Sequence, residues 1–192
     1  MSTTEIKVGG LGGQGVIMTG MIIGRGASIF DTKHATLTQA FGPEARGSAC
    51  SAQIIISDES IEYPYVHRPD LLVVMSQEAY TRFVPEMSPE GTLIYESELV
   101  HPRVLSAEIA QYGIPATRIA EDLGRRLVSN IVMVGFIAAV ADLVESDALR
   151  KSVEASVPKG TESLNLGAFD RGYAHGQDLK AGKSPEKLAA SE

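Results

Sequence analysis

The chain has 192 residues, 44% of them hydrophobic and 21% charged, which is typical of one globular domain with a buried core. Its formal net charge of −7 disfavours a nucleic-acid-binding surface, because such a surface needs a basic face. The single cysteine, Cys50, can neither form an internal disulfide nor hold an iron–sulfur cluster alone. The longest apolar stretch, 131–144, is too short to span a bilayer. We therefore expect a cytoplasmic protein that binds neither nucleic acid nor membrane.

Predicted strands and helices alternate along the chain. A strand at 6–8 ends in a glycine turn at Gly9 and Gly10, and further strands are predicted at 35–39, 50–56, 71–75 and 91–95. Helices are predicted at 16–29, 77–83, 116–123, 128–144, 147–157 and 164–179. This alternation predicts an α/β fold, a single Rossmann-like domain over residues 1–180 with a largely parallel sheet flanked by helices. The small, polar segment 181–192 is expected to be a mobile tail.

Two of these segments are expected to be buried. The continuous apolar run at 71–75 suits a strand covered on both faces, as in a parallel sheet. The helix at 128–144 has no polar face, so it belongs in a core or an interface, and the pattern favours the core.

The first candidate site is the glycine-rich segment 9–15. Gly10, Gly12 and Gly15 fit the spacing G-x-G-x-x-G after a strand and before a helix, with Gly13 and Gln14 between them. Glycines let the backbone approach a ligand closely, and a helix start attracts phosphate. The motif is weak alone, because a tight turn that packs helix on strand gives the same pattern. No acidic residue ends the second strand and no lysine closes the loop, which disfavours ordinary NAD and ATP sites.

The second candidate site is the segment 39–48, between two predicted strands. Arg46 is flanked by the small residues Ala45, Gly47 and Ser48, which leave room for a phosphate to reach its guanidinium group. Glu44 could orient Arg46 or contact a partner chain. Taken alone, the residues equally allow a surface loop with a solvated ion pair.

Taken together, the two loops resemble the gamma subunit of 2-oxoacid:ferredoxin oxidoreductases. The resemblance runs through 10–16 and 39–47 and continues at 51–57, 61–64, 69–73, 76–80, 113–117 and 165–169. This ordered set spans about residues 5 to 176, nearly the whole chain.

The resemblance implies a chemistry that is divided between chains. These enzymes oxidatively decarboxylate a 2-oxoacid with coenzyme A, giving an acyl-CoA, carbon dioxide and two electrons. Thiamine diphosphate with Mg is expected on alpha and beta partner subunits. Iron–sulfur clusters, on a ferredoxin-like subunit or domain, would pass electrons to ferredoxin or an NAD-linked acceptor.

For this chain the resemblance implies binding of coenzyme A and no catalytic residue of its own. The positions that match are Gly10, Gly12, Gly13, Gln14, Gly15, Glu44, Arg46, Gly47 and Ser48. The overall pattern is nearest to the 2-oxoglutarate type, with phenylglyoxylate and indolepyruvate relatives as alternatives. A stand-alone nucleotide-sensing module and an independent NAD enzyme are the other hypotheses.

The remaining conspicuous residues favour structural roles. Cys50 lies in a predicted strand and is expected to be a small buried hydrophobe. The four histidines show no pair at metal-ligand spacing, so no metal site is predicted. Tyr63, Pro64 and Tyr65, followed by Val66, form an aromatic patch that is expected at the core edge, with an interface as the alternative.

Overall fold

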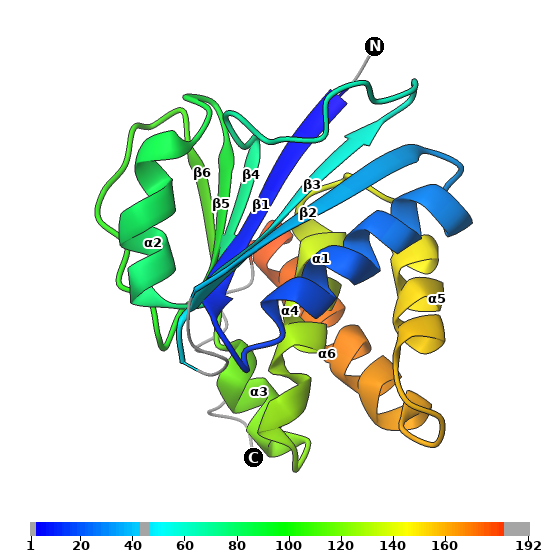
Figure 1. The fold of residues 1–192 in the computed structure, drawn as a ribbon. Helices are drawn as coiled ribbons and strands as arrows, with labels where there is room; N and C mark the ends of the chain where they lie inside the picture. The colour runs from blue at the N-terminus through cyan, green and yellow to red at the C-terminus, as the bar shows by residue number, and fades with distance from the viewer. Residues whose placement is uncertain (1–2, 43–46, 183–192) are drawn as a thin grey trace.

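A six-stranded sheet forms the centre of the computed structural model, which describes residues 3–42 and 47–182 (Figure 1). The strand order is β2 (His34–Phe41), β3 (Ala49–Ser57), β1 (Thr3–Leu11), β4 (Leu71–Val74), β5 (Thr92–Glu96) and β6 (Ala110–Ile114). The pairs β1–β4, β4–β5 and β5–β6 are parallel, whereas β3 runs antiparallel to both β1 and β2. The prediction of a largely parallel sheet is therefore confirmed, with β3 as the reversed strand.

Helices cover the two faces of the sheet unequally. One face carries a large apolar cluster with α1 (Val16–Arg25), its π-helical continuation η1 (Gly26–Phe30), α3 (Ala116–Asp122) and α4 (Ser129–Val140). Packed against these are α5 (Ser146–Ser156) and α6 (Glu162–Lys180). The other face carries α2 (Gln77–Phe83) over a smaller cluster. Short 3-10 turns, η2 (Val84–Glu86) and η3 (Arg126–Val128), complete the described chain.

The apolar helix α4 is buried in the core of this chain, as its pattern predicted. Every residue from Asn130 to Val140 is buried. A Cβ at Gly135 would lie 2.0 Å from the Phe169 carbonyl oxygen of α6, and one at Gly172 would lie 1.9 Å from that of Val132. The two helices therefore pack backbone against backbone, which only glycine permits at these positions.

Several predicted boundaries were wrong. Gly9 and Gly10 continue strand β1, where they pair with Ser51 and Cys50, so the turn starts at Gly12, three residues later than expected. The predicted helix at 16–29 is α-helical only to Arg25. The strand β6 was not predicted, because its sequence Ala-Gln-Tyr-Gly-Ile has little apolar alternation.

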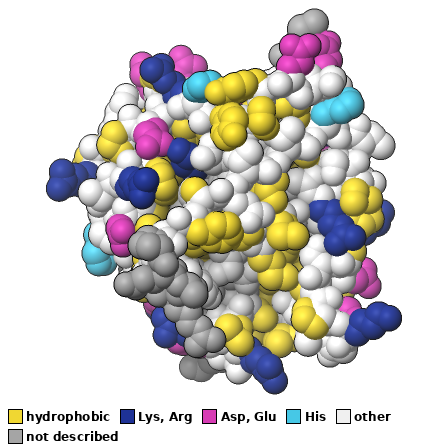
Figure 2. Space-filling model, in the orientation of Figure 1, with side chains coloured by type: hydrophobic (Ala, Val, Ile, Leu, Met, Phe, Trp, Pro, Cys, Tyr) yellow, Lys and Arg dark blue, Asp and Glu magenta, His cyan; other side chains and the backbone are white. Residues whose placement is uncertain are grey.

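The outer surface includes a hydrophobic region beside the edge strand. In the orientation of Figure 1, hydrophobic side chains gather in the region of β2 and α1 (Figure 2). Among the exposed hydrophobic residues on these elements and on η1 are Met21, Ile29 and Phe41. None of the helices within 3–42 and 47–182 has the length and hydropathy required to cross a bilayer.

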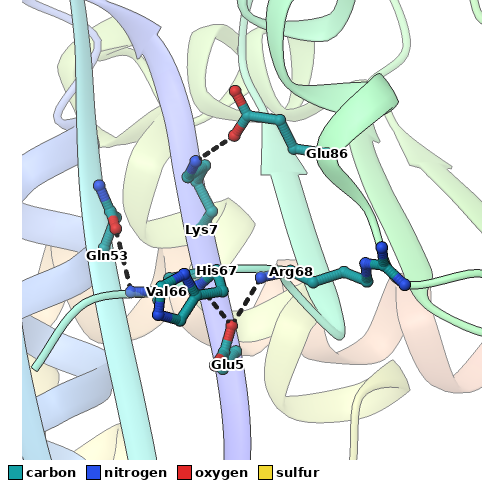
Figure 3. Close-up of polar contacts among 7 residues, drawn as sticks. All are labelled: Glu5, Lys7, Gln53, Val66, His67, Arg68 and Glu86. Atoms are coloured by element: carbon teal, nitrogen blue, oxygen red, sulfur yellow. Dashed lines mark hydrogen bonds and ion pairs between the residues drawn. The ribbon is translucent and has the colours of Figure 1, made fainter. Parts of the chain in front are cut away.

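The connection between β3 and β4 is fastened to the sheet by side chains of β1 and β3. The Glu5 carboxylate accepts hydrogen bonds from the backbone N–H groups of His67 and Arg68, at 2.7 and 2.8 Å (Figure 3). The Gln53 amide oxygen accepts one from the Val66 N–H group at 3.2 Å. These bonds hold an irregular segment against the same face of the sheet as α2, on the part that α2 does not cover.

The same segment exposes the predicted aromatic patch. The side chains of Tyr63 and Tyr65 are 55% and 54% exposed, so the core-edge prediction is wrong for both, while Val66 is buried. The Tyr63 ring stacks on His67 with 5.2 Å between centroids. The tyrosines are exposed because the segment lies on the outer surface of the sheet, with no further layer covering it.

A buried lysine was also not foreseen. Lys7 of β1 is only 6% exposed, forms an ion pair with Glu86, and lies 4.8 Å from the centre of the Phe83 ring (Figure 3). Ion pairing of a buried ammonium group avoids the cost of leaving its charge unpaired.

Candidate functional site

The two candidate loops lie side by side at one edge of the sheet. The glycine loop follows the carboxyl end of β1, and segment 42–48 joins β2 to β3. The Gly12 N–H group donates to the Ser48 carbonyl at 2.9 Å, and the Gly47 N–H group donates to the Gly12 carbonyl at 3.4 Å. In sheets of this kind, ligands bind beyond the carboxyl ends of the parallel strands. Of the predicted site residues, Glu44 and Arg46 lie outside the described residues.

The glycines of these loops serve different purposes. Gly13 has φ 100° and Gly47 has φ 76°, and a Cβ at either position would meet no atom of the described residues within 4 Å. Gly15 also has a positive φ, 76°, but its Cβ would lie 2.6 Å from Asn130 Cγ. A Cβ on Gly10 would meet Gln14 Oε1 at 2.7 Å. Gly10 and Gly15 are thus required by packing, whereas Gly13 and Gly47 border open space.

Gln14 braces the glycine loop. Its amide oxygen accepts a hydrogen bond from the Leu11 N–H group at 2.7 Å, and its amide nitrogen donates to the Met75 carbonyl at 2.7 Å. Met75 immediately follows β4, so the side chain ties the loop to the neighbouring strand. Both ends of the amide are therefore engaged in holding the loop.

The start of α1 leaves backbone N–H groups available. Gly15 caps the helix without a side-chain hydrogen bond, and the first turn holds no acidic residue. Within the described part of the chain, neither the Gly13 nor the Gly15 N–H group makes a hydrogen bond. Unpaired N–H groups and the positive end of the helix dipole together favour an anion at this place.

A groove runs between the glycine loop and the β2–β3 connection. It has a volume of about 610 Å³ and is lined by the glycine loop with Val16, Met18, Phe41, Gly42, Ser48 and Cys50. None of its described lining residues carries a charge. We call it the loop groove. Its lining combines the backbone of the glycine loop with apolar side chains.

A neighbouring pocket adds a cation that sequence reasoning missed. This pocket, of about 360 Å³, shares Phe41 and Ser48 with the loop groove and adds Glu78 and Arg82 of α2. No ion pair links Arg82 to a described carboxylate, and its guanidinium lies 5.4 Å from the Phe83 ring centre. No motif marked Arg82, because it lies in the last turn of an ordinary helix.

A third cavity, of about 230 Å³, opens on the other side of Gly13 and is lined by Glu96 and Arg126 among others. Glu96 is 1% exposed. Its carboxylate accepts hydrogen bonds from the N–H groups of Glu98, Leu99 and Thr117, at 2.9, 2.7 and 3.2 Å. The buried acid therefore holds the start of α3 in place, as a capping carboxylate does.

Cys50 is a structural residue. Its side chain is 8% exposed, and burial raises the pKa of the thiol above its ordinary value. A raised pKa keeps the sulfur protonated and therefore unreactive. The prediction of a small buried hydrophobe is confirmed.

Comparison with known proteins identifies the class. Residues 5–175 match the family described as Pyruvate ferredoxin/flavodoxin oxidoreductase. Subunit KorC of 2-oxoglutarate synthase from Methanocaldococcus jannaschii is 41% identical over 177 residues, covering 91% of this chain and 95% of the relative. The chain therefore belongs to this oxidoreductase family, as the two loops suggested.

Solved structures agree with this assignment. The gamma subunit of a keto/oxoacid ferredoxin oxidoreductase from Geobacter sulfurreducens superposes with a TM-score of 0.78 at 33% identity, covering 90% of this chain and 98% of that one. A 2-oxoglutarate:ferredoxin oxidoreductase from Magnetococcus marinus, solved with 2-oxoglutarate, coenzyme A and succinyl-CoA, gives a TM-score of 0.80 at 20% identity. It covers 93% of this chain but only 32% of that chain, so the same fold there forms part of a longer polypeptide.

Proposed function

We propose that this chain is the gamma subunit of a thiamine diphosphate-dependent 2-oxoacid oxidoreductase and that its glycine loop helps to bind coenzyme A. The enzyme would convert a 2-oxoacid and coenzyme A to an acyl-CoA and carbon dioxide, releasing two electrons. The observation that carries the proposal is the contact of Gly12 with Ser48, which brings both candidate loops to the uncapped start of α1. The single cysteine and the cluster chemistry both fit a reducing, cytoplasmic compartment.

The loop groove suits the two halves of coenzyme A. Phosphates need donors, and the free N–H groups of Gly13 and Gly15 are donors beside a helix start. The pantetheine arm is mostly apolar and extended, which fits a groove with Met18 and Phe41 along its sides. Arg46, which lies between Gly42 and Gly47 in the sequence, is the arginine that we propose for a phosphate, with Arg82 as a second cation.

The remaining chemistry belongs to partner chains. Alpha and beta subunits would hold thiamine diphosphate with Mg, and a ferredoxin-like subunit or domain would hold the iron–sulfur clusters. Among the described residues, no group of three His, Cys, Asp or Glu side chains is placed to hold a metal. This chain's own contribution is to hold and orient coenzyme A, not to break a bond.

2-Oxoglutarate is the proposed oxoacid because the relatives named above point to it. Phenylglyoxylate and indolepyruvate enzymes are the alternatives within the family. An independent NAD enzyme is disfavoured by topology as well as by motif, because β2 is separated from β1 by β3 and ends without an acidic residue.

The test measures the two substrates separately in the assembled enzyme. In Arg46→Ala, we expect the apparent KM for coenzyme A to rise about 10-fold or more, as for the loss of a charge-assisted hydrogen bond. The apparent KM for the 2-oxoacid should stay within about twofold. Arg171→Ala is the matched control, since Arg171 is an exposed arginine on α6 that lines neither pocket. An unchanged coenzyme A dependence in Arg46→Ala would remove Arg46 from the site.

A further inference from the structure

The strand β2 forms a long edge of the sheet without the usual protection. It spans eight residues, or about 26 Å at the ordinary rise of a strand. Its sequence, His-Ala-Thr-Leu-Thr-Gln-Ala-Phe, contains no proline and no Lys, Arg, Asp or Glu. Proteins normally protect such an edge with charge, proline or a bulge, because unpaired N–H and C=O groups invite another strand. An unprotected edge of this length is expected to be covered in the working assembly.

The register identifies which backbone groups are free. Gly42 N–H donates to the Ala49 carbonyl at 2.9 Å, and the same register pairs Thr38 with Gln53. Because hydrogen-bonded pairs alternate along an antiparallel ladder, even-numbered residues of β2 bond to β3. The N–H and C=O groups of Ala35, Leu37, Gln39 and Phe41 therefore point away from the sheet. Since β2 is the edge strand, no described strand lies on the side to which these four residues direct their N–H and C=O groups.

An apolar groove accompanies this edge. A cavity of about 550 Å³ lies between α1 and β2, and its lining includes Met18, Met21, Ile29 and Leu37. Met21 and Ile29 are 53% and 59% exposed. Met18 also lines the loop groove, which Phe41 lines as well, so the two grooves share an apolar side chain. We call this cavity the edge groove.

An added strand would fill the edge groove with its own side chains. Ala35 and Leu37 face the side of the sheet that α1 covers, because both pack against its core cluster. Residues directly opposite one another in neighbouring strands share a face. Side chains of an incoming strand that lie opposite Ala35 and Leu37 would therefore point into the groove beside Met21 and Ile29. Backbone pairing supplies affinity and the groove supplies selectivity, as in other cases of strand addition.

The charge in the groove indicates the chemistry of the occupant. Arg25 is the only charged residue among the described lining of the edge groove. Its guanidinium donates to the Ala155 carbonyl at 3.1 Å and to Ser156 Oγ at 3.5 Å, and no described carboxylate pairs with it. A carboxylate on the incoming strand would complete this site. The strand β2 itself has no acidic residue, which argues against a second copy paired through the same strand.

We propose that β2 pairs with a strand of a partner subunit, whose alternate apolar side chains fill the edge groove and whose acidic residue contacts Arg25. This inference rests on the proposed function, since it requires that the chain work in a hetero-oligomer. In the Magnetococcus marinus oxidoreductase, a fold of this kind belongs to a polypeptide about three times longer. There the rest of the polypeptide is permanently tethered to the fold, whereas here a separate chain would be docked on it.

The first test changes the groove without changing the core. The complex is purified through a tag on this chain, and native mass spectrometry measures how much of each partner subunit remains bound. We expect Met21→Glu to weaken partner retention about 10-fold or more, because a charge would be buried against apolar side chains. Val104→Glu is the matched control, as Val104 is 99% exposed outside the groove, and it should retain its partners. Equal retention in both variants would overturn the proposal.

The second test detects the backbone hydrogen bonds that the proposed strand pairing would form. Amide hydrogen exchange at single-residue resolution is compared between the free chain and the complex. The outward N–H groups of Leu37, Gln39 and Phe41 should become protected only in the complex, while Thr36 and Thr38 should be protected in both. An equal change in protection at all five positions on complex formation, or no change at the outward positions, would contradict strand pairing. A wild-type chain that purifies without partners would instead contradict the proposed function, so the two failures are distinguishable.

Discussion

Glycine occurs both in the α4–α6 contact and in the loops at the sheet edge, but for opposite reasons: lack of space in the first place and backbone conformation in the second. Gly135 and Gly172 are needed because there is no space: carbonyl oxygens of the opposite helix lie about where their Cβ atoms would be. Gly13 and Gly47 have positive φ, and no atom of the described residues lies within 4 Å of their Cβ positions, so the backbone conformation is what they provide. Gly15 combines both demands. A glycine in a motif is therefore not by itself a ligand contact, and its surroundings decide which role it has.

The largest effect is expected from the helix contact. Gly135→Ala should lower the free energy of unfolding by about 3 kcal/mol or more, because the two helices must separate to admit a methyl group. Urea denaturation, monitored by circular dichroism, measures this change in the free energy of unfolding. Gly167→Ala is the control: Gly167 lies in α6 with nothing within 4 Å of its Cβ position, so alanine should stabilise the chain by about 0.5–1 kcal/mol. Similar effects of the two changes would refute the packing account of Gly135.

An intermediate effect is expected at Gly15. Alanine there combines the strain of positive φ with the contact to Asn130, so Gly15→Ala should cost about 2–4 kcal/mol. The double variant Gly15→Ala/Asn130→Ala should recover part of this loss, and the same denaturation series measures it. If removing the Asn130 side chain recovers no stability, the contact with Asn130 does not contribute to the loss caused by Gly15→Ala.

A smaller effect on stability is expected at Gly13, where strain acts alone. Gly13→Ala should cost about 1–2 kcal/mol, less than Gly15→Ala. Because its methyl group would enter the open space beside the proposed phosphate donors, the apparent KM for coenzyme A should rise more than that for the 2-oxoacid. Steady-state kinetics of the assembled enzyme measures both. A coenzyme A dependence as in the wild type would show that no ligand approaches this position.

The smallest effect concerns pH and lies at the same helix contact. Burial lowers the pKa of His175 on α6 below its ordinary value of 6.5, an effect that nearby Asp178 opposes and Arg118 reinforces. The folded state therefore prefers the neutral ring, which lies 5.8 Å from the Phe136 ring between centroids. This contribution to stability is complete above pH 6.5 and is lost as the pH falls from there through the folded-state pKa. His175→Gln should flatten that part of the stability curve, and parallel wild-type and variant curves between pH 7 and 5 would contradict the assignment.

Sequence patterns predicted the elements whose signal is local and strong. The run at 71–75 predicted a strand buried on both faces, and all four residues of β4 are buried. The helix at 128–144 was recognised as buried from its lack of a polar face. The strand patterns alone did not predict the direction of β3, although the connection at 42–48 is too short for the crossover that a parallel pair needs. β6 was missed because tertiary contacts and not alternation place it beside β5.

The candidate site was predictable in its loops but not in its supports. The glycine spacing located the turn at the start of α1, and the structure places Gly12 against Ser48 as two neighbouring loops require. The glycine spacing did not indicate that Gly10 belongs to the strand or that Gln14 bonds to Met75. It also did not indicate that Arg82 approaches from another helix. These depend on contacts between segments that are far apart in sequence, such as the 61 residues that separate Gln14 from Met75. Such contacts leave no periodic pattern in either segment.

The central claim is that this chain works as a coenzyme A-binding subunit of a 2-oxoacid oxidoreductase. The most direct measurement is made on the native complex purified through this chain, assayed with a panel of 2-oxoacids for coenzyme A-dependent reduction of a viologen dye. The account predicts brown, cluster-bearing partner chains and strong activity, with 2-oxoglutarate as the preferred acid. A colourless chain that purifies alone and reduces nothing with any acid would contradict it.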